Sequence, residues 1–343
     1  MEGAFGMNAN EKYYRRVIGS IGAAMLLFLG LINSFFVVLA FLDEIFAWFP
    51  MSYVSYTVTY QLLYSAGYLA SFMVPVALLK KLIGGAGYPV QPMLVLKKPT
   101  AWWFLIIPAG IAVVYSMAYI NASMVSIFDY AEYSSEVLWG NTGTAPAAFE
   151  LILEFIVICL VPGFCEEFLF RGAILSNLRP FGRSNAILIS AFLFSMMHQN
   201  AEQLLYTFAA GIVLGLVYEM TGSIWCSTVL HVINNFVSVS QTALFYKLDP
   251  VRAALAISIL EMGLLVVGVI CLTVLVAHFF SKKTDLRQGF FQKELPMSDG
   301  YAACPVEGMR AKKLFFTPCM IVFLILAALN VIILLGSSMF YGA

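Results

Sequence analysis

Charged side chains are scarce in this sequence. Asp, Glu, Lys and Arg together make up 11% of its 343 residues, whereas hydrophobic residues make up 61%. An ordinary soluble domain carries about 25% charged residues. The composition therefore excludes a typical soluble protein and predicts an all-α, polytopic transmembrane helical bundle. The formal net charge is zero, which argues against nucleic acid as a partner and leaves membrane lipid as the surroundings of the chain.

Several familiar signatures are also missing. The six cysteines lie mostly inside apolar runs and form no CxxC pair, so we expect free thiols, with neither a disulfide framework nor a zinc knuckle. The chain has no HExxH motif of soluble zinc proteases and no GxSxG elbow of serine hydrolases. The first apolar run, 17–42, lacks a small-residue cleavage site, so we expect a retained spanning helix and no signal peptide.

Apolar runs of about 17 to 25 residues predict the membrane spans. The expected organisation is three N-terminal helices in 1–146, a catalytic four-helix core in 147–243, an eighth helix in 244–280, a cytoplasmic polar linker in 281–314 and a ninth helix in 315–343. About nine spans are predicted, near 17–41, 55–79, 102–126, 147–176, 184–198, 203–220, 223–243, 254–280 and 315–338.

The distribution of Lys and Arg predicts the orientation. Four segments that fall on one side under the nine-span count hold 16 of the 19 cationic residues, whereas only Lys247 and Arg252 fall on the other side. Cytoplasmic loops carry the excess of Lys and Arg. We therefore expect a cytoplasmic N-terminus. We also expect the bacterial cytoplasmic membrane, because nothing resembles a eukaryotic retention signal.

The stretch 162–172 places three charged residues inside a membrane-length apolar segment. Each charge near the bilayer centre costs about 2.5 to 3.5 kcal/mol, so such groups are usually paired and functional. Glu167 and Arg171 are four residues apart and share a helix face, which favours an ion pair. Glu166 is rotated by about 100° from Glu167, and we expect it to be the reactive carboxylate.

Two of the three histidines follow in later spans. His198 ends the sequence Phe194-Ser-Met-Met-His, and His231 lies four residues before Asn235, on the same helix face. From the helical rise, Glu166 and His198 should lie at similar depth, whereas His231 comes out shallower. The third histidine, His278, is expected at the membrane interface.

A glutamate, two histidines and an amide in a partly dry cavity can activate water in two ways. In the first, Glu166, His198 and His231 hold a metal ion such as zinc, which acidifies its bound water. In the second, no metal is needed: Glu166 takes a proton from water with the help of His198, while His231 and Asn235 stabilise the oxyanion. Glu154 and Glu261 also lie in apolar spans, but no motif surrounds them.

The three motifs together resemble those of the CAAX-protease and bacteriocin-processing (CPBP, or Abi) family of intramembrane metalloproteases. The resemblance covers about 150–240. It implies an all-helical membrane peptidase with its site built from these residues, whereas the extension 281–343 exceeds the eight-helix plan of the prenyl-protein branch. The matching residues are Glu166, Glu167 and Arg171; Phe194 and His198; and His231 and Asn235.

We therefore predict an intramembrane endopeptidase that acts on a membrane-associated or hydrophobic peptide. Two alternatives remain open at the level of the sequence. One is a non-proteolytic membrane protein, such as a bacteriocin-immunity or scaffold protein, that keeps the fold and works by binding. The other is a proton-coupled transporter that uses the same acid and histidines as a relay.

Overall fold

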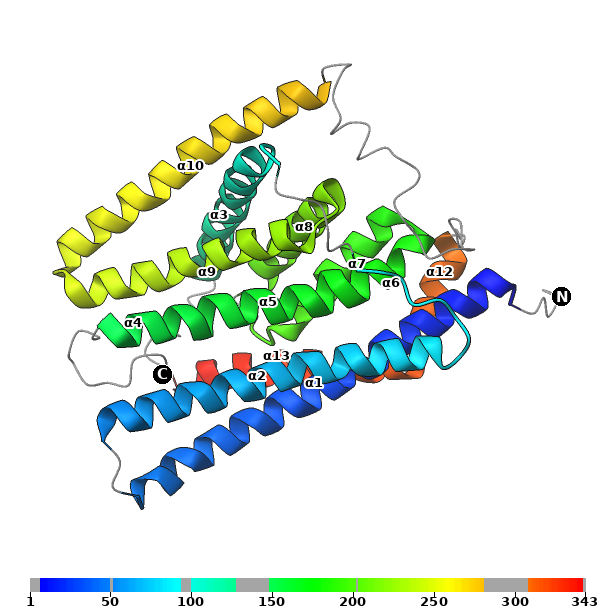
Figure 1. Cartoon of the computed structure of the whole chain (residues 1–343), viewed down its shortest axis with the longest axis horizontal. Coiled ribbons are helices and arrows are strands. Elements are labelled where there is room, and N and C mark those ends of the chain that lie inside the picture. Colours follow the sequence, from blue (N-terminus) through cyan, green and yellow to red (C-terminus); the bar gives the residue numbers. More distant parts are fainter. Residues whose placement is uncertain are drawn as a thin grey trace.

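The computed structural model describes residues 7–49, 52–93, 100–127, 148–201, 203–280 and 308–341, and these residues form helices and short connections, with no strand among them (Figure 1). The helices are α1 Ala9–Ala47, α2 Tyr53–Gly84, α3 Trp103–Ile127, α4 Ala148–Glu154, η2 Phe155–Leu160, α5 Val161–Glu167, η3 Phe168–Leu175, α6 Ser176–Leu178, η4 Arg179–Phe181, α7 Arg183–Met197, α8 Leu204–Thr221, α9 Ile224–Lys247, α10 Pro250–Phe280, α12 Gly308–Phe315 and α13 Pro318–Tyr341.

The all-helical, polytopic architecture is confirmed, whereas the count of nine spans is not. Each predicted span coincides with a helix, and six helices in the described part of the chain are long and apolar enough to cross a membrane. The apolar helix α7 and the described apolar part of α13, Pro318–Ile333, are shorter. Helix α9 has 24 residues, but its polar side chains at 231, 234 and 235 lower its hydropathy.

The long helices lie roughly side by side (Figure 1). Helix α2 packs between α1 and the continuous helix that runs from α4 to α6, which we call the acid helix (148–178). Helix α9 packs on the other side of the acid helix, and α3 and α10 pair beyond α9. The hairpin of α7 and α8 packs against η3, and α13 packs on α1. The acid helix is therefore enclosed by helices from both ends of the sequence.

Cationic side chains join several helices at one end of the bundle. Arg16, near the start of α1, donates two hydrogen bonds to the Leu82 carbonyl at the end of α2. Arg179 forms an ion pair with Glu219 at the end of α8, with 2.9 Å between Nε and Oε1. The predicted polar linker lies outside the described residues up to 307, and its last part forms the short helix α12 beside α1.

The cysteine prediction holds for the described residues. Five cysteines are free thiols, and the sixth, Cys304, lies outside the described residues.

Candidate active site

The acid helix is irregular where its charged residues lie. The sequence predicts one α-helix over 147–176, but π-helical turns (η2 and η3) flank the short α5 that carries Glu166 and Glu167. Single π-helical turns inside α-helices are frequent at functional sites. Pro162 provides a physical reason for η2: it has no N–H group and cannot donate to the Ile158 carbonyl four residues earlier.

The Ile158 carbonyl, to which Pro162 cannot donate, binds a side chain of the site. Asn235 Nδ2 on α9 donates to Ile158 O at 3.3 Å. A second carbonyl, Phe170 O in η3, accepts a hydrogen bond from Ser190 Oγ on α7 at 2.9 Å. Irregular backbone inside a membrane is tolerated where neighbouring side chains satisfy it. These bonds tie the acid helix to both of its histidine-bearing neighbours.

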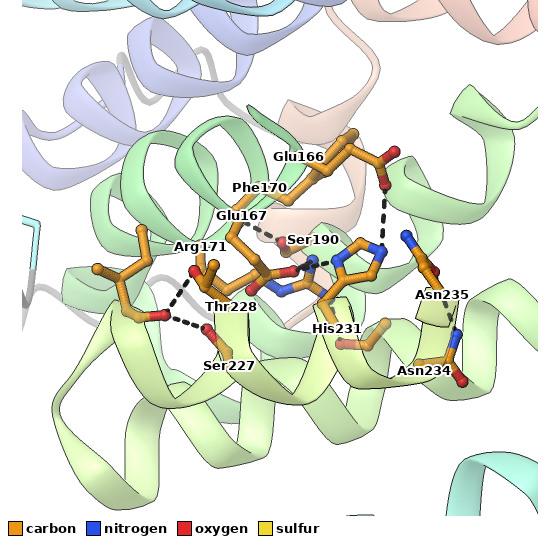
Figure 2. A network of polar contacts seen from close by, with 12 residues as sticks. Glu166, Glu167, Phe170, Arg171, Ser190, Ser227, Thr228, His231, Asn234 and Asn235 are labelled. Carbon is orange, nitrogen blue, oxygen red and sulfur yellow. Dashed lines mark hydrogen bonds and ion pairs between the residues drawn. The ribbon is translucent and has the colours of Figure 1, made fainter. Parts of the chain in front are cut away.

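Glu166 has a different partner on each carboxylate oxygen. Its side chain is buried, and Oε1 accepts a hydrogen bond from Tyr68 OH of α2 at 2.6 Å. Oε2 makes no hydrogen bond within the described residues and lies 3.7 Å from His231 Nε2 (Figure 2). That distance is too long for a hydrogen bond. Glu166 therefore has one oxygen held by Tyr68 and one buried oxygen that lies beside His231 without a hydrogen bond within the described residues.

Glu167 forms the predicted ion pair and also contacts a histidine. Its Oε1 lies 2.7 Å from Arg171 Nη1 and 3.1 Å from His231 Nδ1, and the carboxylate and the guanidinium are both fully buried (Figure 2). A carboxylate at Nδ1 fixes the orientation of an imidazole ring and leaves Nε2 for chemistry. The sequence predicted the ion pair but not the contact with His231. Glu167 thus holds the ring whose other nitrogen faces Glu166.

Phe194 lies between the charged groups and His198. The guanidinium of Arg171 stacks 4.7 Å above its ring, and the His198 ring packs edge-on at 4.8 Å. His198 caps the C-terminus of α7, and its Nδ1 lies 2.8 Å from Phe194 O. Arg171 Nη2 also donates to Gly211 O on α8 at 3.0 Å. These contacts explain why a phenylalanine stands four residues before the histidine.

The predicted residues converge on one cavity. A cavity of about 640 Å³ is lined by Glu166, His198, His231 and Asn235, whereas Glu167 and Arg171 are buried outside its lining. The helical rise placed His231 at a shallower depth than Glu166. In the structure, however, the His231 ring lies close to the Glu166 carboxylate. The sequence analysis missed other residues of the lining, which include Tyr64, Tyr68, Tyr206, Asn234 and Ser238.

Close packing of α5 on α9 brings the acids and His231 together. A Cβ atom on Gly163 would lie 2.6 Å from Val232 Cγ2. Only glycine permits this approach without a shift of α9. The glycine of the motif therefore sets the distance between the helices that carry Glu166 and His231.

The other candidates from the sequence do not line this cavity. Glu261 on α10 accepts hydrogen bonds from Tyr119 OH at 2.5 Å and from Gln241 Nε2 at 2.8 Å. Glu154 is buried, and neither of its oxygens has a hydrogen-bond partner within the described residues. The His278 ring packs against Trp102, with 4.8 Å between centroids.

The residues proposed for zinc do not form a ligand cluster here. No group of three or more His, Cys, Asp or Glu side chains within the described residues is arranged to hold a metal ion. Glu166 Oε1 is bonded to Tyr68, and His198 Nδ1 is directed to its own helix. As they stand in the described structure, the three side chains are not arranged as a three-ligand site.

Part of the chain matches a known protein family. Residues 148–237 match the family model described as Type II CAAX prenyl endopeptidase Rce1-like. This stretch, about a quarter of the chain, is similar to that family. It contains all six predicted site residues, whereas Tyr68 comes from outside it. No curated protein matches the chain, and no solved structure does.

Proposed function

We propose that the protein is an intramembrane endopeptidase that hydrolyses a peptide bond of a membrane-associated or hydrophobic peptide. The observation that carries the proposal is the lining of one cavity by Glu166, His198, His231 and Asn235, inside helices that match a CAAX-protease model. Such a cavity holds a carboxylate base, histidines and an amide donor in surroundings that largely exclude water. These are the groups that peptide hydrolysis by activated water requires.

In the proposed mechanism, Glu166 acts as the general base. Its Oε2 takes a proton from a water molecule, the water oxygen attacks the peptide carbonyl carbon, and the same carboxyl later delivers the proton to the leaving nitrogen. The Tyr68 hydroxyl holds Oε1 and leaves Oε2 as the base. His198, which also lines the cavity, assists the proton transfer. A positioned base contributes about 10² to 10⁴ in rate.

His231 and Asn235 stabilise the oxyanion of the tetrahedral intermediate. The Asn235 amide has two N–H groups, and the hydrogen bond to Ile158 O directs one of them and thereby orients the other. Glu167 accepts a hydrogen bond from His231 Nδ1 and holds the ring, and the protonated imidazolium donates from Nε2 to the oxyanion. Removal of one oxyanion donor typically costs about 10² to 10³ in turnover.

Cleavage of a defined peptide tests the proposal. The full-length protein, purified and reconstituted in liposomes, is incubated with prenylated and unprenylated hydrophobic peptides, and new termini are identified by mass spectrometry. We expect cleavage by the wild-type protein and none by Glu166→Gln. Stable binding of peptide without cleavage would favour the scaffold alternative, and proton-coupled uptake without cleavage would favour the transporter alternative.

Zinc dependence is a separate proposal, and elemental analysis decides it. In the zinc version, Glu166, His198 and His231 are the ligands, and His198 binds through Nε2 while Nδ1 keeps its contact with Phe194 O. About one zinc per active chain that is lost in His198→Ala supports zinc. Activity that survives exhaustive chelation without bound metal supports the carboxylate mechanism.

We also propose a cytoplasmic N-terminus in a bacterial cytoplasmic membrane. The supporting observation is the 16-to-2 distribution of Lys and Arg. Single cysteines introduced into 281–313 should react with a membrane-impermeant reagent only after the cells are opened. Labelling of these positions in intact cells reverses the orientation.

A further inference from the structure

The C-terminal helix α13 makes a polar contact with the stretch 148–237, although α13 itself lies outside that stretch. Met320, Phe323 and Ala327 are fully buried, and Asn330 follows on the same helix face. Asn330 is the one polar side chain in the sequence 320–335. Polar side chains in membrane helices usually bond across helices. A specific partner for Asn330 is therefore expected.

Helix α13 is held tightly against α1. A Cβ atom on Gly22 of α1 would lie 2.9 Å from the Cys319 carbonyl carbon, so the two backbones are in close contact. Helix α13, which carries Asn330, is therefore packed firmly against α1.

The partner of Asn330 is the residue that follows His198. Asn330 Nδ2 donates to Gln199 Oε1 at 2.5 Å. Gln199 has φ of 51°, the one positive value among the described residues other than glycine. This left-handed conformation is unfavourable for a residue with a long side chain, and such strained positions persist only where surrounding contacts hold them. Helices often end in this conformation, but with glycine or asparagine.

We propose that Asn330 and Gln199 form a C-terminal latch that positions His198 at the end of α7. The hydrogen bond of the latch stabilises the left-handed conformation of Gln199. That conformation sets the direction of the backbone after His198, and so the positions of Asn200 and Gln203, which line the cavity. Asn330 and Gln199 are positioning residues that touch no substrate. The inference rests on the proposed peptidase function for its kinetic consequence, whereas the structural consequence can be measured without activity.

The kinetic test uses a matched control and a rescue. Asn330→Leu should lower kcat about tenfold with KM nearly unchanged, because small displacements of a catalytic group reduce turnover strongly. Asn33→Leu on α1 is the control, since the Asn33 amide donates only within its own helix, to Leu29 O at 2.8 Å, and it should leave kcat unchanged. Glycine adopts positive φ without strain. When Gln199→Gly is added to the Asn330→Leu variant, the double variant should therefore recover most of the lost kcat.

The structural test is hydrogen–deuterium exchange of the full-length protein in detergent. In Asn330→Leu, amides of 198–203 should exchange at least about tenfold faster, with α7 before residue 195 unchanged. If Asn330→Leu exchanges the amides of 198–203 at the wild-type rates and has an unchanged kcat, the latch is overturned. If the wild-type protein cleaves no peptide, the peptidase proposal fails, and the exchange measurement alone still supports or overturns the latch.

Discussion

The acid helix and α10 are both membrane-length apolar helices that carry carboxylates, yet they differ in almost every other respect. Helix α10 is a regular α-helix of 31 residues, and much of its surface, such as Ile259 and Met262, is exposed. Its Glu261 is hydrogen-bonded at both oxygens. The acid helix changes between α and π turns, and two of its carboxylates, Glu166 and Glu167, are buried beside His231.

This difference separates a carboxylate that is fully hydrogen-bonded from the carboxylate that we propose as the base. An acid in a membrane helix can be satisfied by neighbouring donors and do nothing further. In the acid helix, one buried oxygen of Glu166 lacks a hydrogen bond within the described residues, and the Glu166 residue lines a cavity. The irregular backbone also offers carbonyls that fix side chains of other helices. We propose the active site where several helices converge on Glu166, whose Oε2 has no hydrogen bond within the described residues.

The largest expected effect is the loss of cleavage in Glu166→Gln. Glutamine keeps the shape and accepts the Tyr68 hydrogen bond, but it cannot take a proton from water. We expect an inserted, folded protein with peptide cleavage reduced about a hundredfold or more. Cleavage is measured by mass spectrometry, and folding by size-exclusion chromatography. If this variant turns over normally while Glu167→Gln is folded and inactive, the two carboxylates have been assigned the wrong roles.

Glu167→Gln should act mainly on stability. The change leaves the fully buried Arg171 without its counter-ion and weakens the contact with His231 Nδ1. Breaking a buried ion pair by removing one partner costs about 3 to 5 kcal/mol. We expect a lower thermal unfolding temperature in detergent and lower expression.

A compensating change checks the cause of that instability. Arg171→Met in the Glu167→Gln background removes the unpaired charge, so part of the lost stability should return. A double variant less stable than Glu167→Gln would show that Arg171 stabilises the bundle chiefly through Gly211 and Phe194.

Pro162→Ala separates activity from stability. Alanine restores an N–H group that competes with Asn235 for the Ile158 carbonyl. Proline inside a helix costs about 3 kcal/mol, so the variant should be as stable as the wild-type protein or more so. Turnover should fall about tenfold as Asn235 loses its orientation. Pro108→Ala, inside α3, is the control and should not change turnover. An active Pro162→Ala variant argues against a role for this carbonyl.

The helices and most of the site were predictable because their signals are local. Apolar runs mark spans, and charged or histidine residues inside them are costly enough to indicate function. Glu166, His198, His231 and Asn235 could therefore be identified individually. Their convergence followed from the resemblance to a family, because spacing along separate helices does not give the distances between them.

The contacts missed by the sequence depend on tertiary structure. Tyr68 belongs to a run of tyrosines on α2, and nothing local distinguishes it from Tyr60 or Tyr64. The contact between His231 and Glu167 requires the close approach of α5 and α9 at Gly163. Pro162 was a usable signal for the π-helical turn, since a proline within a helix removes a backbone hydrogen bond. The left-handed Gln199 had no sequence signal at all.

The smallest expected effect is that of Glu261→Gln, which tests whether α10 is only structural. Glutamine retains one acceptor for Tyr119 OH, and the Gln241 amide can rotate to present its oxygen to the new NH₂ group. Both interhelical bonds therefore survive, and a neutral side chain is easier to accommodate in the membrane than a charged one. We expect less than about a threefold change in peptide cleavage, and a change in unfolding free energy within about 1 kcal/mol, as for a typical hydrogen bond.

Tyr119→Phe, which removes a donor to the same carboxyl, is the matched comparison and should destabilise the protein slightly more. A carboxyl that relayed protons could not be replaced by an amide, so loss of cleavage or of any transport activity in Glu261→Gln would place α10 within the functional region and remove the contrast with the acid helix.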